Sequence, residues 1–338
     1  AVSSAIADFV FMEEKAKMFV NSPNALAGND EKKCDTASAD FQSGESGLAD
    51  VVGSAEEILA KVRTLVSVLP ANNEDDMSYD ECGDDLNRLC ENIESFRGDT
   101  GKALSMISDD GFFFEVKENY GPEMVTAFIR LNGMTVGCVA NRTEVLDEEN
   151  EKTAEYEPVL GARGCDKAAE FVSFCDAFNI PVLALVNVKG YKQSKCTERR
   201  IAKAAGRLTY AFANADVPKV TVVIGEAYGS AYVTMNSKSI GADIVYAWPD
   251  AKIGMMDAAA AVKIMYAEEI SASDKAAALI SEKAAEYEAL QSSAAAAAGR
   301  GYVDDIIKAD ETRQRVIAAF EMLFTKREGR PSRKHGTV

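Results

Sequence analysis

Histidine is almost absent from the sequence. The single His, His335, lies in the basic C-terminal stretch KREGRPSRKH of this 338-residue chain. A Ser-His-Asp or Cys-His catalytic set would have to include this residue, and a terminal tail rarely holds a side chain in a fixed orientation. The sequence therefore argues against both catalytic sets, and we interpret the basic stretch as a solvated tail.

Long apolar runs are absent as well. The longest, from Ile180 to Val188, is interrupted by Pro181 and Asn187. It is far shorter than the roughly 20 residues that a membrane-spanning helix needs. The first residues, AVSSAIADFVF, have neither an initiator Met nor the basic start of a signal peptide. These absences predict a cytoplasmic protein.

The sequence also lacks CxxC motifs and a net positive charge. The seven Cys include no CxxC pair, which favours reduced thiols over disulfides and over a zinc site. A net charge of -17 repels nucleic acid, although it leaves room for a partner with a positive face. We therefore expect neither a metal site nor a nucleic-acid interface.

The chain is long enough for two domains, and its character changes once. Apolar residues recur at three- and four-residue steps from Ser54 to Leu69, which predicts one amphipathic helix. Pro70 and the acidic stretch NNEDDMSYDECGDD follow, and such a polar run is typical of a connector between domains. We expect the boundary in this region and divide the chain into residues 1–90 and 91–338.

Strands and helices alternate after the connector. Asn132-Gly133 between two apolar runs predicts a two-residue hairpin turn. The predicted strands are 112–116, 124–131, 135–140, 182–188, 219–224 and 244–247. The predicted helices are 164–179, 198–213, one starting near Gly229, several Ala-rich helices from 258 to 298, and 312–326. This alternation implies parallel strands joined by right-handed crossovers, and hence an α/β fold.

The segment VPKVTVVIGEAYGSAYVTMNSK, from Val217 to Lys238, is the most informative for function. A β-branched strand is followed by small residues at the start of a helix. Such a turn points free backbone N–H groups out of the helix, as in an oxyanion hole. Glycine and alanine also permit close helix packing, and their spacing alone favours that simpler interpretation.

Several long segments occur in the order and at the spacing of a known family. They are IADFVFMEEKAKMFVNSPNAL (6–26), EFVSFCDAFNIPVLALVNVKGY (170–191), AYGSAYVTMNSK (227–238), DIVYAWPDAKIGMM (243–256) and RGYVDDIIKADETR (300–313). The chain resembles the carboxyltransferase component of biotin-dependent acyl-CoA carboxylases and decarboxylases, of the propionyl-/methylmalonyl-CoA type.

The resemblance implies a crotonase-like (ClpP/crotonase) α/β fold in two related domains. Residues 1–90 would be the C-terminal part of the family's N-terminal domain, and residues 91–338 its biotin-facing C-terminal domain. In family assemblies the first domain of one subunit faces the second domain of another, typically in a hexamer. We therefore expect a homo-oligomer in which the 190–195 loop and the 228–232 turn face another subunit.

The resemblance also implies a reaction. A carboxyl group would pass between biotin, tethered to a biotin carboxyl carrier protein, and the alpha carbon of a coenzyme A thioester. Such a transfer needs backbone donors for two anionic oxygens. One set of donors would be Ser230 and Ala231, after Gly229. The biotin-binding residues would be Val188, Gly190, Tyr191 and Tyr228, and the substrate pocket would include Tyr232 and Val233.

Three features depart from the family pattern. Val233 stands where many propionyl-type relatives have Asp, so the acyl preference stays open. Lys189 replaces a Pro in the loop at the biotin entrance and makes that loop less rigid. Residues 257–261 replace a Gly-Ala-Lys-Gly-Ala run, and we assign no site there.

The start of the chain leaves alternatives open. Family members carry a long segment, with a Gly-Gly oxyanion hole, upstream of the motif that begins here at Ala1. We interpret the chain as a fragment that is inactive alone; a split subunit completed by another chain is the other interpretation.

The alternative function is that of a catalytically silent assembly subunit that docks a biotin carrier. A crotonase-type hydratase or a ClpP-like protease lacks candidate residues. In a decarboxylase, a sodium-pumping membrane subunit would be a further partner.

Overall fold

A mixed eight-stranded sheet forms the centre of the molecule, which a computed structural model describes over residues 1–75 and 81–329. Its strand order is β14-β12-β11-β9-β5-β4-β3, and β13 pairs with β11 beyond the end of β12. The hairpin β4–β5 is antiparallel, whereas β5, β9, β11, β12 and β14 run parallel. The strands are β3 (Phe114–Glu115), β4 (Met124–Leu131), β5 (Met134–Asn141), β9 (Val182–Val188), β11 (Lys219–Tyr228), β12 (Ile244–Ala247), β13 (Lys252–Gly254) and β14 (Asp305–Ile306).

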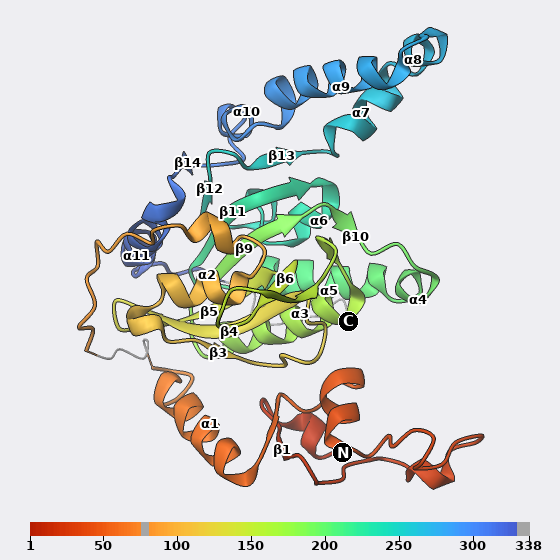
Figure 1. The fold of residues 1–338 in the computed structure, drawn as a ribbon. Coiled ribbons are helices and arrows are strands. Elements are labelled where there is room, and N and C mark those ends of the chain that lie inside the picture. The colour runs from red at the N-terminus through yellow and green to blue at the C-terminus, as the bar shows by residue number, and fades with distance from the viewer. Residues whose placement is uncertain (76–80, 330–338) are drawn as a thin grey trace.

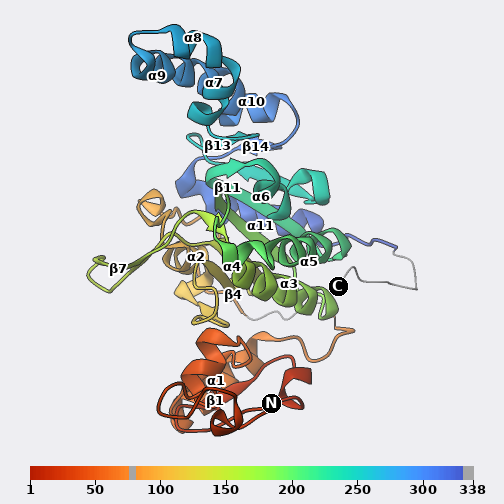
Figure 2. The same ribbon diagram turned by 90° about the vertical axis from the view of Figure 1, so that its right-hand side faces the viewer.

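Helices cover both faces of this sheet, as Figures 1 and 2 show. On one face lie α3 (Ala162–Ala177) and α5 (Ile201–Asn214). On the other lie α2 (Thr100–Ile107) and α11 (Thr312–Leu323). The sheet is therefore buried on both sides, which explains why its parallel strands are continuous apolar runs.

Strand β9 shows how the two faces divide the core. Its side chains alternate, so that Val182, Ala184 and Val186 belong to the cluster with α3 and α5. Leu183 and Leu185 point the other way, into the cluster with α2 and α11. The period of two residues is that of any strand, and here both sets of side chains are removed from water.

Most predicted elements are confirmed, with two differences in the parallel part. Strands β4, β9 and β12 begin and end where the sequence predicts. Strand β11 continues past Ile224 to Tyr228, because its register against β9 shifts between Val223 and Ala227. The single helix predicted over 198–213 is two helices, α4 (Lys195–Glu198) and α5. The Ser194 side chain caps α4, accepting a hydrogen bond from the N–H of Thr197 (3.1 Å).

The first part of the chain forms a small unit below the sheet in Figure 1. Its strands β1 (Phe11–Glu13) and β2 (Val51–Gly53) pair in parallel, and α1 (Ala55–Val68) follows directly. Ser54 and Glu57 cap that helix reciprocally, side chain to backbone. The predicted amphipathic helix is thereby confirmed, and its capping box fixes where it begins.

This unit is attached to the central sheet by both apolar and charged contacts. The ring of Phe9 packs edge-to-face on Phe174 of α3, with 4.7 Å between ring centroids. The Lys117 ammonium lies 3.5 Å from an Asp50 carboxylate oxygen and donates to the carbonyl of Gly47 (2.7 Å). These contacts fix residues 9–50 on the layer formed by α3.

The Ala-rich region forms an arm that projects from the body at the top of Figure 1. Its helices are α7 (Ala258–Met265), α8 (Ala267–Ala272), α9 (Ala276–Tyr287) and α10 (Ala294–Gly299). The helical expectation for this region is confirmed. Large apolar side chains remain exposed on and beside the arm: Met255, Ile264, Met265 and Leu290.

Within residues 1–75 and 81–329, no helix is long and apolar enough to cross a membrane. Over the same ranges, no group of three or more His, Cys, Asp or Glu side chains is placed to hold a metal ion. His335 and the end of the basic stretch lie outside the described residues.

A buried ion pair ties α11 to the β4–β5 hairpin. Arg313 is fully buried; its guanidinium contacts Asp109 (2.7 Å) and donates to the carbonyl of Ile107 (2.6 Å). The two oxygens of Asp109 also accept the backbone N–H groups of Asn132 (3.1 Å) and Gly133 (2.7 Å), which form the hairpin turn. The last residue of the RGYVDDIIKADETR segment therefore fixes the position of the hairpin.

We predict that Arg313→Leu lowers the free energy of unfolding by about 3–5 kcal/mol, because it leaves Asp109 buried and unpaired. Arg315→Ala is the matched control two residues away, since Arg315 is exposed and pairs only with Asp305 and Glu311 among the described residues. Its loss should cost about 1 kcal/mol or less. Urea unfolding of both variants measures the difference, and equal effects would contradict this role of Arg313.

A second buried cation makes stability depend on pH. Lys167 of α3 is buried, and its ammonium donates to the carbonyl of Lys117 (2.9 Å). Burial lowers the pKa of Lys167 to about 7. The unfolded chain therefore binds more protons than the folded chain above that pH, so stability attributable to this residue rises as the pH increases from about 7 toward the ordinary lysine value.

We predict that Lys167→Met removes this dependence. The stability gap between variant and wild type should shrink by on the order of 2 kcal/mol between about pH 7 and pH 9.5, as the wild-type ammonium loses its proton. Denaturant unfolding at both pH values measures it. A gap that does not change with pH would show that Lys167 is not desolvated in the folded protein.

Candidate functional site

The strand-to-helix turn after β11 is the centre of the candidate site. Strand β11 ends at Tyr228, and the short helix α6 (Gly229–Thr234) starts immediately. Gly229 has a φ of 58°, and a Cβ there would lie 3.0 Å from the carbonyl oxygen of Met255. Both facts require glycine at this position. The turn is therefore tight, and the Met255 carbonyl lies close to Gly229.

Ser230 and Ala231 occupy the first turn of α6. Ser230 is exposed, whereas Ala231 as a whole residue is only 1% exposed and packs into the core. The first N–H groups of an α-helix have no acceptor inside the helix. Ser230 therefore lies at the surface, whereas Ala231 is buried together with its backbone.

The loop after β9 lies beside this turn. The parallel ladder pairs Val188, the last residue of β9, with Ala227 of β11. Next, β10 (Gly190–Tyr191) pairs with β8 (Val159–Leu160). The Tyr191 hydroxyl lies 3.0 Å from the Thr234 hydroxyl of α6. Two predicted site segments, far apart in the sequence, are therefore brought together at the carboxyl-terminal edge of the sheet.

Two buried asparagines position these loops, and sequence reasoning missed both. The Asn187 side-chain oxygen accepts the backbone N–H of Glu226 (3.1 Å), and the N–H of Asn187 donates to the side-chain oxygen of Asn141 (3.1 Å). A Cβ at Gly225 would lie 2.6 Å from the same Asn187 oxygen. The sequence did offer a signal, because Asn187 is a polar residue within an otherwise apolar strand. A polar side chain at a buried position is normally hydrogen-bonded, so such a residue indicates a structural contact.

Two tyrosines of the site, Tyr228 and Tyr232, are buried. Burial raises the pKa of Tyr232 to about 12, and burial followed by the Glu226 charge raises the pKa of Tyr228. Within the described part of the chain, the buried Tyr232 hydroxyl has no hydrogen-bond partner. Val233, next to it, is half-buried. Neither tyrosine is suited to act as a base near neutral pH.

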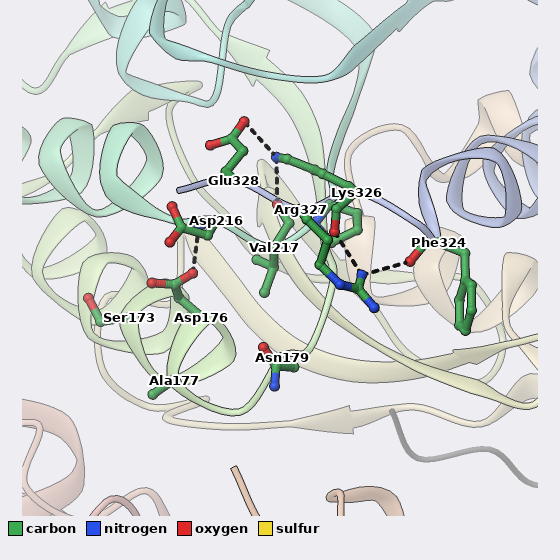
Figure 3. A pocket seen from close by; sticks show the side chains of 11 residues that line it. Ser173, Asp176, Ala177, Asn179, Asp216, Val217, Phe324, Lys326, Arg327 and Glu328 are labelled. Carbon is green, nitrogen blue, oxygen red and sulfur yellow. Dashed lines mark hydrogen bonds and ion pairs between the residues drawn. The ribbon is translucent and has the colours of Figure 1, made fainter. Parts of the chain in front are cut away.

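Cavities elsewhere in the molecule do not coincide with this turn. A hollow of 510 Å³ near Asp176, Asp216 and Lys326 lies at the opposite, amino-terminal ends of β9 and β11 (Figure 3). Another, of 810 Å³, lies between the arm and the sheet, near Lys252 and Glu288. Ligands in open α/β sheets bind at the carboxyl ends of the strands. The turn after β11 is at that end.

Comparison with known proteins decides the family. The carboxyl transferase domain matches residues 1–338, the whole chain. The chain belongs to the carboxyl transferase domain family. This confirms the resemblance inferred from the sequence segments.

The names of proteins related to this carboxyl transferase domain refer to small acyl-CoA thioesters. It is 38% identical to the methylmalonyl-CoA carboxyltransferase 12S subunit of Propionibacterium freudenreichii subsp. shermanii, over 99% of this chain and 64% of that protein. It is 36% identical to the propionyl-CoA carboxylase carboxyltransferase subunit of Haloferax mediterranei, over 99% and 66%. It is 35% identical to the methylmalonyl-CoA decarboxylase subunit alpha of Propionigenium modestum, also over 99% and 66%. The chain thus spans slightly less than two thirds of these relatives.

Solved structures confirm the crotonase-like fold. A crystal structure of the transcarboxylase 12S hexamer, with hydrolysed methylmalonyl-coenzyme A bound, superposes on this carboxyl transferase domain with a TM-score of 0.88. The sequences are 36% identical, over 98% of this chain and 64% of that chain. The likeness covers both the sheet and the unit before it.

We predict that Gly229→Ala lowers the free energy of unfolding by about 1–2 kcal/mol, because a side chain at positive φ is strained and meets the Met255 carbonyl. Gly206→Ala is the matched control: Gly206 lies within α5 with open space around it. That change should stabilise by about 0.5–1 kcal/mol. Thermal unfolding of both variants measures whether each change lowers or raises the stability. A Gly229→Ala protein as stable as wild type would contradict the described turn.

Proposed function

We propose that this chain carries the biotin-facing half of a carboxyltransferase site, in which a carboxyl group moves between biotin on a carrier protein and the alpha carbon of an acyl-CoA. The observation that carries the proposal is the pairing of an exposed helix-start turn at Ser230 with the loop after Val188, in a chain 35–38% identical to subunits named for this chemistry. The acyl group would be of the propionyl or methylmalonyl class.

The turn supplies donors rather than an acid–base pair. Carboxyl transfer passes charge onto oxygen atoms, and fixed N–H groups stabilise such charge without a proton transfer. The N–H groups of Ser230 and Ala231 would donate to one of these oxygens, and Gly229 would let it approach. The raised pKa values of Tyr228 and Tyr232 agree with this role, because both hydroxyls keep their protons.

We assign the biotin side of the site to the loop after β9. Biotin on its carrier supplies the carboxyl group in transferable form. Val188, Gly190 and Tyr191 would line its entrance together with Tyr228. A Cβ at Gly190 would meet no atom within 4 Å, so there is open space beside this loop. Lys189 stands where the family has a proline. Its ammonium lies 3.0 Å from the Glu226 carboxylate, and this ion pair connects the loop to β11.

The acyl pocket would be formed by Tyr232 and Val233, one turn into α6. A valine that replaces an aspartate removes a charge beside the acyl group and favours an apolar substituent there. The buried Tyr232 hydroxyl, which lacks a partner among the described residues, fits a polar group of the thioester substrate.

We further propose that the division near residue 90 separates two domains with different tasks. The first part of the chain shares the apolar cluster of α3 through Val51, Leu65 and Val68, whereas Cys90 and Ile93 pack in the other cluster, with α2. A homo-oligomer, as in the 12S hexamer named above, would bring the first domain of another subunit to the turn. Carboxylase and decarboxylase directions, the latter with a membrane partner, are both compatible with this arrangement.

We predict that Ser230→Gly keeps most of the carboxyl-transfer rate in the polypeptide that the native gene encodes, because the backbone N–H is retained. Ala231→Pro removes one donor and should lower kcat about a hundredfold or more. Ala231→Gly is the matched control, which changes the same side chain but keeps the N–H. The rates of carboxyl transfer from methylmalonyl-CoA to free biotin measure the effects, after unchanged melting profiles have been verified.

A nearly inactive Ser230→Gly protein with a normal melting profile would show that the hydroxyl takes part in the chemistry. An Ala231→Pro protein of normal rate would show that this N–H is not a donor. Either outcome overturns the assignment of the turn.

A further inference from the structure

Three hydroxyl groups form a continuous hydrogen-bond network at the loop after β9. The Tyr191 hydroxyl lies 3.0 Å from the Thr234 hydroxyl, which lies 3.1 Å from the hydroxyl of Thr209. Thr209 in turn donates to the backbone carbonyl of Ala205, four residues earlier in α5 (2.9 Å). We call Tyr191, Thr234 and Thr209 the hydroxyl network. It connects β10, α6 and α5 within one polypeptide.

The number of available protons fixes the direction of each hydrogen bond in the network. A hydroxyl group donates one hydrogen bond, and a carbonyl oxygen only accepts. Because Thr209 donates to the Ala205 carbonyl, its hydroxyl accepts from Thr234. The Thr234 hydroxyl then accepts from Tyr191. This is the one arrangement that satisfies all three contacts, so removal of the Thr234 hydroxyl takes a partner from both of its neighbours.

The hydroxyl network is largely shielded from water. Thr234 is 4% exposed, and Thr209 and Tyr191 are half-buried. The Tyr191 ring packs against the apolar cluster of α3 and α5. A buried hydroxyl that loses its partner is costly, because water does not take the partner's place. The network therefore holds the Tyr191 side chain more firmly than an exposed hydrogen bond would.

Helix α6 connects the network to the proposed donors. Its second and third residues, Ser230 and Ala231, are the proposed donors, and its last residue, Thr234, contacts Tyr191. An α-helix rises about 1.5 Å per residue, so Ser230 and Thr234 are only about 6 Å apart along one short element. Figure 1 shows β10 beside α6, and the two elements are in contact. The network thus fixes the position of the loop relative to the donors.

We propose that Thr234 and Thr209 are positioning residues for carboxyl transfer, which hold Tyr191 and the loop after β9 in place beside the turn of α6. The inference rests on the proposed function, because the loop and the turn are the two sides of that site. In this role neither threonine contacts biotin, and each acts through Tyr191. Small displacements of reacting groups cost large factors in rate. A loosened loop should therefore impair the use of biotin and leave the binding of the acyl-CoA unchanged.

The test is a double-mutant cycle on carboxyl transfer from methylmalonyl-CoA to free biotin, using the polypeptide that the native gene encodes. Thr234→Val removes the hydroxyl from a side chain of nearly the same shape. It should lower kcat/KM for biotin about tenfold and keep the KM for methylmalonyl-CoA within about twofold of wild type. Thr234→Ser retains a hydroxyl and should stay within about threefold of wild type. In a Tyr191→Phe background, Thr234→Val should have no further effect, because the contact is already lost.

Two further variants make the test specific. Thr209→Val removes the next hydroxyl of the network and should lower kcat/KM for biotin about threefold. Thr126→Val is the matched control: Thr126 is also buried, and its hydroxyl donates to the carbonyl of Val116 (2.7 Å) on β4, two strands away from β9. This control should lower stability and keep kcat/KM for biotin within about twofold of wild type.

The outcomes separate this inference from the proposed function. Suppose that wild type transfers carboxyl groups to free biotin. An unchanged kcat/KM in folded Thr234→Val, or an effect that adds fully to that of Tyr191→Phe, would then overturn the inference alone. So would a Thr234→Ser protein as impaired as Thr234→Val, because the hydroxyl would not be the group that matters. If Thr234→Val does not fold, the same comparison with Thr209→Val decides. Absence of transfer by wild type would overturn the proposed function, and this inference with it.

Discussion

The parallel ladder between β9 and β11 is the constraint on which the site depends. Because the two strands run in the same direction, both end at one edge of the sheet, and Val188 lies opposite Ala227. The Asn187 side chain accepts the Glu226 N–H and allows the register to shift there. The shift extends β11 to Tyr228, so the tight turn at Gly229 starts beside the loop of Gly190 and Tyr191. The geometry of the proposed donors follows from these backbone contacts.

A second buried set of polar contacts stabilises the opposite layer. Arg313 and Asp109 connect α11 to the hairpin turn at Asn132 and Gly133, at the edge of the sheet that begins the parallel part. Arg313, the last residue of the family-like segment, therefore has a structural role in packing.

Sequence reasoning located the strands whose apolar runs are bounded by turn residues, such as 182–188 and 244–247, because burial on both faces leaves a clear pattern. It placed the turn at Gly229 correctly for the same reason. It missed the two-residue strands β8 and β10, which are too short to show any period. It also missed the Asn141–Asn187 and Arg313–Asp109 contacts, since hydrogen bonds between distant segments leave no local signal. The roles of Ser230 and Ala231 came from family resemblance; the structure places both residues at the start of α6, with Ser230 exposed and Ala231 buried.

The central claim is that this chain contributes to carboxyl transfer with small acyl-CoA thioesters. The most direct measurement is the rate of carboxyl transfer to free biotin from methylmalonyl-CoA and from malonyl-CoA, using the polypeptide that the native gene encodes. The account predicts that methylmalonyl-CoA donates its carboxyl group, forming carboxybiotin and propionyl-CoA, and that malonyl-CoA reacts much more slowly. A folded protein that binds a biotin carrier but transfers a carboxyl group from neither donor would contradict the account and favour the silent assembly subunit.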